Sequence, residues 1–162
     1  MEILDKISLA LNRILIFMGG VFLAGMVVLT CSNIFCRVVW VPVKGTYELM
    51  GYAGAVITAF ALGYTQIHKG HIAVDILVKC FSEKTQKFIG CINSAICLIF
   101  FSFAGWQIVK IGTNLMETGE TTETLKIIYY PFTYSVALGC FALALVMFVD
   151  FLKYFANEKE AG

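Results

Sequence analysis

Four long stretches of the 162-residue chain contain no aspartate, glutamate, lysine, arginine or histidine; they are residues 14–36, 49–67, 88–109 and 127–149. At about 1.5 Å per helical residue, each stretch reaches about 28 to 35 Å, which matches a hydrocarbon core about 30 Å thick. Lipid offers no partner for backbone N–H and C=O groups, and none of the stretches alternates as a barrel strand does. The sequence therefore predicts an all-α integral membrane protein with four transmembrane helices.

The composition agrees with a membrane protein and argues against a soluble domain. Hydrophobic residues make up 59% of the chain and charged residues 14%, against about 25% charged residues in an average soluble domain. The formal net charge is only +1, so no basic surface is available for nucleic acid. No linker, repeat or low-complexity tract divides residues 1–162, which we expect to form a single domain. We expect the first stretch to be retained, because it is too long for a secretory signal.

The distribution of lysine and arginine predicts the orientation, because cytoplasmic loops retain an excess of both residues. Four of them lie in the two connections that follow the first and third stretches, namely Arg37, Lys44, Lys110 and Lys126. The other eight lie before the first stretch, between the second and third, and after the fourth. We therefore expect both the N- and the C-terminus to be cytoplasmic.

The connection between the second and third stretches is amphipathic. Apolar residues such as Ile72, Ile76 and Leu77 recur at helical spacing, and Asp75 and Lys79 lie on the other side. This pattern predicts a helix over about residues 71–84 in the inner headgroup layer. An ordinary loop that packs a few apolar residues against the end of the bundle is the alternative.

The predicted spans contain no residue that could carry membrane chemistry. An ionisable group at a helix centre is normally a functional marker, and none of the four stretches has one. A self-sufficient proton-coupled transporter and a haem-binding bundle are therefore both disfavoured. The six cysteines form no C-x-x-C pair, and the group His68, His71 and Asp75 is weak evidence for a metal site. We expect no catalytic residue, no cofactor and no metal.

Small residues form a stripe along the second stretch, at every fourth position: Gly51, Ala55, Ala59 and Gly63. Such a stripe lets another helix approach closely. The approaching helix can belong either to the same bundle or to another subunit, and the sequence leaves both possibilities open.

Several short elements resemble one known family. They are Arg37 after the first stretch, Gly45-Thr46-x-Glu48-Leu49 before the second, Gly70-His71-Ile72-x-Val74-Asp75 after it, Gly112 after the third, and Pro131 with Gly139 in the fourth. The Gly-His-Ile-x-Val-Asp element is the most specific. In this order, and with four spans, the chain resembles the small membrane subunit of tripartite ATP-independent periplasmic (TRAP) transporters.

The resemblance implies a function without catalysis, in the bacterial inner membrane as a multi-pass protein. In such systems a periplasmic substrate-binding protein delivers an organic acid, often a carboxylate, to a large membrane transport subunit, which usually moves it with sodium. The small subunit braces the large one and helps to dock the binding protein. A membrane anchor subunit of an oxidoreductase is the alternative from another class. A homo-oligomeric channel is disfavoured, because the polar residues of the spans are too scattered to line a pore.

The same reasoning assigns roles to individual residues. The residues with expected structural or partner-contact roles are Arg37, Glu48, Gly51, Ala55, Ala59, Gly63, His71, Asp75 and Pro131. Glu48 suits the positive N-terminal end of the second helix, where it either pairs with Arg37 or contacts a partner. His71 and Asp75 are expected to fasten the interfacial helix to the end of the second span.

An acidic segment follows the third stretch. Glu117, Glu120 and Glu123 lie among threonines between Gly112 and Lys126. They form either a solvated loop or a docking surface for the binding protein.

Overall fold

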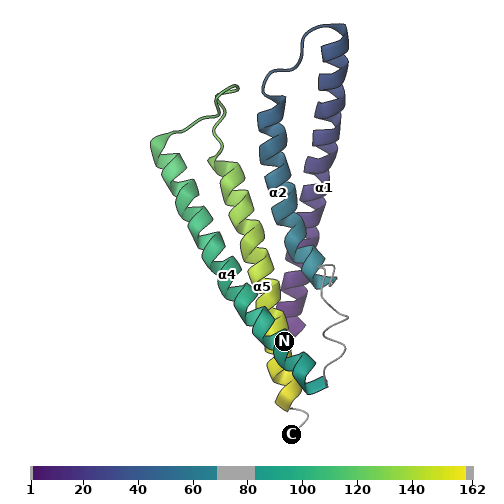
Figure 1. Cartoon of the computed structure of the whole chain (residues 1–162), viewed down its shortest axis with the longest axis vertical. Coiled ribbons are helices and arrows are strands. Elements are labelled where there is room, and N and C mark those ends of the chain that lie inside the picture. The colour runs from purple at the N-terminus through teal and green to yellow at the C-terminus, as the bar shows by residue number, and fades with distance from the viewer. Residues whose placement is uncertain (1, 69–82, 160–162) are drawn as a thin grey trace.

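The computed structural model describes residues 2–68 and 83–159 (Figure 1). In this part of the chain four helices follow one another: α1 (Glu2–Val39), α2 (Thr46–Ile67), α4 (Glu83–Thr118) and α5 (Tyr130–Lys159). Outside the helices, the described residues contain a single isolated bridge, between Thr121 and Ile128, and no strand. The all-helical fold is confirmed. Most of the predicted interfacial helix over residues 71–84 lies outside the described residues.

Three of the four helices are long and apolar enough to cross a membrane, namely α1, α4 and α5. The second helix, α2, is not among them, because glycine, tyrosine, threonine and glutamine interrupt its apolar residues. Its 22 residues would reach about 33 Å, which is sufficient for a span. The expectation of four spans therefore holds for three helices, and a crossing by α2 stays a prediction.

The bounds of three helices differ from those of the charge-free stretches: α1 and α4 extend beyond their stretches, and α5 begins later than its stretch. α1 starts at Glu2 and continues without a break through residues 14–36. α4 runs on to Thr118, about two turns past the end of its charge-free stretch. In contrast, residues 127–129 precede α5 and belong to the loop that connects it to α4.

α5 is the central helix of the bundle. It packs against α4 on one side and α2 on the other, and α1 packs mainly against α2 (Figure 1). Half of the apolar window of α5 is buried, whereas only 11% is buried in the windows of α1 and α4. Most of the apolar surface of α1 and α4 is therefore left for lipid or for a partner.

The core is built by close approach of backbones at small residues. In a bilayer, helices associate through van der Waals packing rather than through the hydrophobic effect, so small residues at crossings are favoured. A Cβ atom added to Gly139 on α5 would lie 2.5 Å from the carbonyl oxygen of Ala59 on α2. Next to this crossing, Val56 and Phe60 of α2 pack with Ala142 of α5 and with Leu15 of α1.

Asn12 of α1 meets Gly63 of α2 at a second close approach. The Asn12 side chain is fully buried, and its amide group donates to the carbonyl of Ser8 at 2.9 Å. Within the described residues its Oδ1 atom has no hydrogen-bond partner, and it points to the place where a Cβ atom of residue 63 would be. Only glycine at position 63 leaves room for this amide.

Polar contacts join three helices at the end of the bundle where both termini lie (Figure 1). Lys153 of α5 forms a salt bridge with Asp5 of α1 at 2.8 Å. Gln66 of α2 donates a hydrogen bond to the Asp150 carboxylate of α5 at 3.2 Å. The start of α1 and the last turns of α5 therefore lie at the same end of the bundle, as four spans require. The assignment of that end to the cytoplasm remains a prediction from the lysine and arginine count.

Candidate functional site

The loop between α4 and α5, residues 119–129, is a folded structure at the end of the bundle opposite the termini. The N–H of Thr122 donates to the carbonyl of Ile127 at 2.9 Å, and the N–H of Ile127 donates to the Thr122 hydroxyl at 3.1 Å. The N–H of Lys126 also donates to the Thr122 carbonyl at 3.1 Å, and Lys126 adopts a positive φ of 52°. Thr122 is buried at the centre of these bonds. This α4–α5 loop closes on itself around one threonine.

Glu48 fastens the α4–α5 loop to the start of α2. Its carboxylate accepts hydrogen bonds from the backbone N–H of Thr124 at 2.8 Å and of Leu125 at 3.3 Å. Partial burial opposes ionisation of Glu48, but hydrogen bonds from Thr124, Leu125 and Thr122 prevail and hold its pKa below the usual 4.5. Glu48 thus connects the start of α2 to the α4–α5 loop, and its expected contact with a partner subunit stays a prediction.

Glu48 does not pair with Arg37, the partner expected from the sequence. Both residues are described, and the structure records no salt bridge between them. Arg37 lies in the last turn of α1, where a positive charge complements the negative end of the helix. The Glu48 carboxylate instead accepts hydrogen bonds from two backbone N–H groups of the α4–α5 loop.

The turn that precedes α2 is shaped to receive this loop. Gly45 caps α2 with a φ of 75°, a left-handed conformation that glycine adopts without strain. A Cβ atom at this position would also collide with the Leu125 side chain of the loop. The buried Thr46 hydroxyl donates to the carbonyl of Val43 at 2.8 Å, and the Val43 N–H donates to Asn33 of α1 at 2.9 Å. The residues of the Gly45-Thr46-x-Glu48 element therefore together hold the start of α2 against the α4–α5 loop.

Aromatic stacking adds a second connection between the loop and α2. The ring of Tyr52 stacks on Tyr129 of the loop, with centroids 5.6 Å apart, and on Phe132 of α5 at 5.5 Å. The Tyr129 hydroxyl donates to the Glu120 carboxylate at 2.7 Å. This hydrogen bond, together with partial desolvation and the charge of Glu120, raises the pKa of Tyr129 above its usual 10.0. The partners of Tyr52 could not be predicted from the sequence, because they lie far along the chain.

The three glutamates expected at a docking surface fall into two groups. All three are exposed, but Glu120 is held by Tyr129. Within the described part of the chain, the carboxylates of Glu117 and Glu123 have no hydrogen-bond or salt-bridge partner. Glu117, in the last turn of α4, and Glu123, in the α4–α5 loop, are thus both presented to solvent.

The small-residue stripe of α2 is divided between two environments. Ala59 and Gly63 are buried, where Gly139 of α5 and Asn12 of α1 approach them. Gly51 and Ala55 are exposed, and a Cβ atom on Gly51 would meet nothing within 4 Å. Half of the stripe thus serves the bundle, and the other half remains open.

Pro131 lies in the first turn of α5, where its missing N–H breaks no helical hydrogen bond. Its carbonyl accepts a hydrogen bond from the Ser135 hydroxyl at 2.9 Å. His71 and Asp75 lie outside the described residues, and their expected roles stay predictions.

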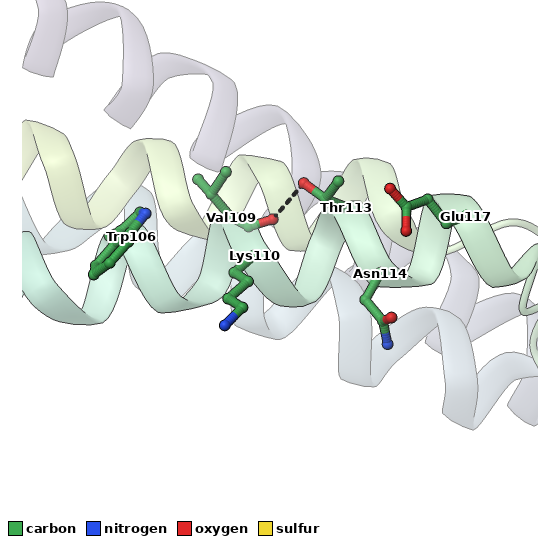
Figure 2. Close-up of a pocket in the computed structure, with 6 residues that line it drawn as sticks. All are labelled: Trp106, Val109, Lys110, Thr113, Asn114 and Glu117. Carbon is green, nitrogen blue, oxygen red and sulfur yellow. Dashed lines mark hydrogen bonds between the residues drawn. The ribbon is translucent and has the colours of Figure 1, made fainter.

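An open hollow of about 380 Å³ lies along the C-terminal part of α4 (Figure 2). It is lined by residues of this helix alone: Trp106, Val109, Lys110, Thr113, Asn114 and Glu117. The Thr113 hydroxyl is occupied by the Val109 carbonyl at 3.0 Å and by Tyr134 of α5 at 3.2 Å. The hollow offers an ammonium group, a carboxylate and an amide, but no nucleophile paired with a base. Among the described residues, no histidine, cysteine or acidic side chains cluster as metal ligands.

Helices that are long and apolar enough to span a membrane, with their charges outside the four charge-free stretches, define a helical membrane protein. Residues 26–157 match the family model described as "Tripartite ATP-independent periplasmic transporters, DctQ component". This match covers most of the chain, which therefore belongs to this family, as the resemblance indicated. Comparisons with curated proteins and with solved structures gave no match.

Membership of this family makes the chain a small membrane component of a TRAP transporter. The family functions with a large membrane subunit and a substrate-binding protein. The oxidoreductase anchor, which was the alternative from sequence, receives no support.

Proposed function

We propose that this chain is a non-catalytic brace for the large transport subunit, in the bacterial inner membrane, in a system that takes up organic acids with sodium. The observation that carries this proposal is the match to the DctQ component over residues 26–157, together with four long stretches that contain no aspartate, glutamate, lysine, arginine or histidine. Charged side chains at membrane depth normally mark a substrate or ion pathway. This chain leaves such groups to its partner.

The uncovered surface of the bundle supports the bracing role. Only 11% of the apolar windows of α1 and α4 is buried within the chain. Helices with this much free apolar surface can pack against a second membrane protein as well as lipid. The tight crossings of α5 with α2, by contrast, make the bundle a stable unit that can stiffen such a partner.

The α4–α5 loop supports a contribution to docking of the substrate-binding protein. Glu117 and Glu123 are exposed and without partners in the described structure, and the loop that carries Glu123 is held by Glu48 and Thr122. Fixed charges at a rim guide association and orientation more than they add affinity. With both termini in the cytoplasm, this loop faces the periplasm.

Uptake in reconstituted vesicles tests the proposed function. Vesicles would contain the large subunit alone, this chain alone, or both, and would receive purified binding protein and a labelled carboxylate with a sodium gradient. We expect uptake only when both subunits are present. Uptake by this chain alone, or full uptake by the large subunit without it, contradicts the proposal.

A further inference from the structure

α4 carries an exposed face that runs along nearly the whole helix. Its positions are spaced alternately three and four residues apart, and every one of them is exposed; they are 93, 96, 100, 103, 107, 110, 114 and 117. This is the spacing with which one helix presents a straight seam to another helix that packs alongside it at a small crossing angle. We call these eight positions the exposed α4 face.

Two amide side chains lie on this face inside the charge-free stretch 88–109. Gln107 has no hydrogen-bond partner among the described residues, and the only hydrogen bond recorded there for the Asn93 side chain comes from the Cys97 thiol, 3.9 Å from its Oδ1 atom. The two amides lie about 21 Å apart along the helix. An amide that faces lipid without a partner is costly, because lipid cannot replace the hydrogen bonds lost from water.

The other helices do not share this property. Among the described side chains, the exposed amides within helices are Asn93, Gln107 and Asn114, and all three belong to the exposed α4 face. The exposed residues of α1 include Phe17, Val21 and Val28, which suit lipid. Free surface alone therefore does not distinguish α1 from α4, but the amides do.

We propose that a membrane-spanning helix of the large transport subunit packs lengthwise on the exposed α4 face. This inference rests on the proposed function, which supplies the large subunit as the partner. The helix that fits carries hydrogen-bonding side chains at two levels, opposite Asn93 and Gln107, and a carboxylate near Lys110. Between the two amides, Ile96, Phe100 and Phe103 are each more than 60% exposed and provide the apolar contact.

The hollow on the C-terminal part of α4 continues this face. Lys110, Asn114 and Glu117 line the hollow and also belong to the exposed α4 face (Figure 2). A side chain of the partner helix fills the hollow, and the carboxylate it brings neutralises Lys110. The contact therefore extends from the apolar centre of α4 to Lys110 and Asn114, and Glu117 at its far edge stays open to solvent.

The charges argue against a second copy of this chain as the occupant. Two identical bundles related by a two-fold axis along the membrane normal would place equivalent positions of a seam opposite each other. Lys110 would then face Lys110, and Glu117 would face Glu117. Like charges in register are unfavourable, so a different helix with complementary charges fits better.

Photo-crosslinking in the intact complex tests the proposal directly. Phe103 on the exposed α4 face and Phe17 on α1 are 62% and 73% exposed, so they form a matched pair. Each would be replaced by p-benzoylphenylalanine, written Phe103→Bpa and Phe17→Bpa, in the full chain produced together with the large subunit. We expect Phe103→Bpa to give an adduct with the large subunit and Phe17→Bpa to give at least fivefold less. An adduct of Phe103→Bpa with a second copy, or with lipid alone, overturns the proposal.

A pair of variants provides an independent readout. In Asn93→Leu/Gln107→Leu, removal of both amides should lower recovery of the large subunit several-fold at an unchanged amount of this chain in the membrane. The control Ser32→Leu, on the exposed side of α1, should leave recovery unchanged. Undiminished recovery with the double variant overturns the proposal. If the unmodified chain recovers no large subunit at all, the proposed function itself fails, which is a different result.

Discussion

The carboxylate of Glu48, at the start of α2, accepts a hydrogen bond of 2.8 Å from the backbone N–H of Thr124, 76 residues later in the chain. A single side chain thus joins the first half of the bundle to the loop that connects the last two helices. The same loop presents Glu123 and ends at Tyr129, which stacks on Tyr52 of α2. The position of the proposed docking surface relative to the bundle therefore depends on Glu48.

Replacement of Glu48 by glutamine should loosen the α4–α5 loop. The neutral amide accepts weaker hydrogen bonds than a carboxylate does, so amide hydrogen exchange at Thr124 and Leu125 should accelerate by about tenfold. Exchange measured by mass spectrometry on the full chain in detergent checks this result. Glu123→Gln, in the same loop but without a recorded partner, is the matched control and should leave exchange unchanged. Equal protection in both variants would show that Glu48 does not hold the loop.

Protonation of Glu48 at low pH should release the α4–α5 loop. The pKa of Glu48 is lowered in the folded chain, so its stabilising contribution is fully present above the ordinary pKa of 4.5 and is lost as pH falls through the folded value. Protection of the Thr124 amide should therefore persist at pH 4.5 and decline below it. In Glu48→Gln this acid-dependent step should be absent. A decline that begins well above pH 4.5 in the unmodified chain contradicts the assignment.

The phenol of Tyr129 should lose its proton at a higher pH than an ordinary tyrosine does. The hydrogen bond to Glu120 and the negative charge of that carboxylate favour the protonated phenol, so the pKa of Tyr129 is raised above 10.0. The contribution to loop stability is present below pH 10 and is lost as pH rises through the folded pKa. The absorbance change that disappears in Tyr129→Phe identifies this titration. Glu120→Gln should lower the pKa of Tyr129 toward 10.0. An unchanged pKa of Tyr129 in that variant would exclude the contact with Glu120.

A methyl group at Gly139 should separate α5 from α2. The added Cβ would lie 2.5 Å from the carbonyl oxygen of Ala59 and 2.6 Å from its carbonyl carbon, which are backbone atoms that cannot rotate away. Gly139→Ala should therefore destabilise the bundle by about 1–3 kcal/mol, the usual cost of overpacking. Thermal unfolding in detergent measures the effect. Gly51→Ala, where a Cβ meets nothing within 4 Å, should unfold like the unmodified chain.

Charge reversal at Glu117 and Glu123 tests the docking surface. Glu117→Lys/Glu123→Lys should lower uptake that depends on the binding protein by several-fold at low salt, and by less at high salt, because exposed rim charges act on association and are screened. Initial rates of uptake in vesicles provide the measurement. Glu120→Gln changes a charge that is already held by Tyr129 and should have a smaller effect. Unchanged uptake with the double reversal at every salt concentration removes these residues from docking.

The helices were predictable because lipid leaves the backbone few alternatives. Each charge-free stretch falls largely within one helix, since a buried backbone in hydrocarbon has to satisfy its own hydrogen bonds. The start of α5 was less predictable. Residues 127–129 are apolar enough to extend the helix, but hydrogen bonds to Thr122 hold Ile127 in the loop. No local sequence pattern predicts that these hydrogen bonds prevail over helix formation at residues 127–129.

The contacts of single residues depended on which segments meet in space. Glu48 belongs to a recognisable motif, Gly45-Thr46-x-Glu48-Leu49. Its partners, however, are backbone N–H groups of the α4–α5 loop, and no sequence pattern predicts such a contact. The division of the small-residue stripe has the same origin. Ala59 and Gly63 are covered because Gly139 and Asn12 happen to lie opposite them, while Gly51 has no such neighbour.

Affinity purification of the tagged chain from its native membrane, in a mild detergent, tests the central claim most directly. A component of a TRAP transporter that braces the large subunit should be recovered with one large polytopic membrane protein, in a fixed ratio and without haem or flavin absorbance. Recovery of the chain alone, or with a flavin or iron–sulfur subunit, would contradict the account.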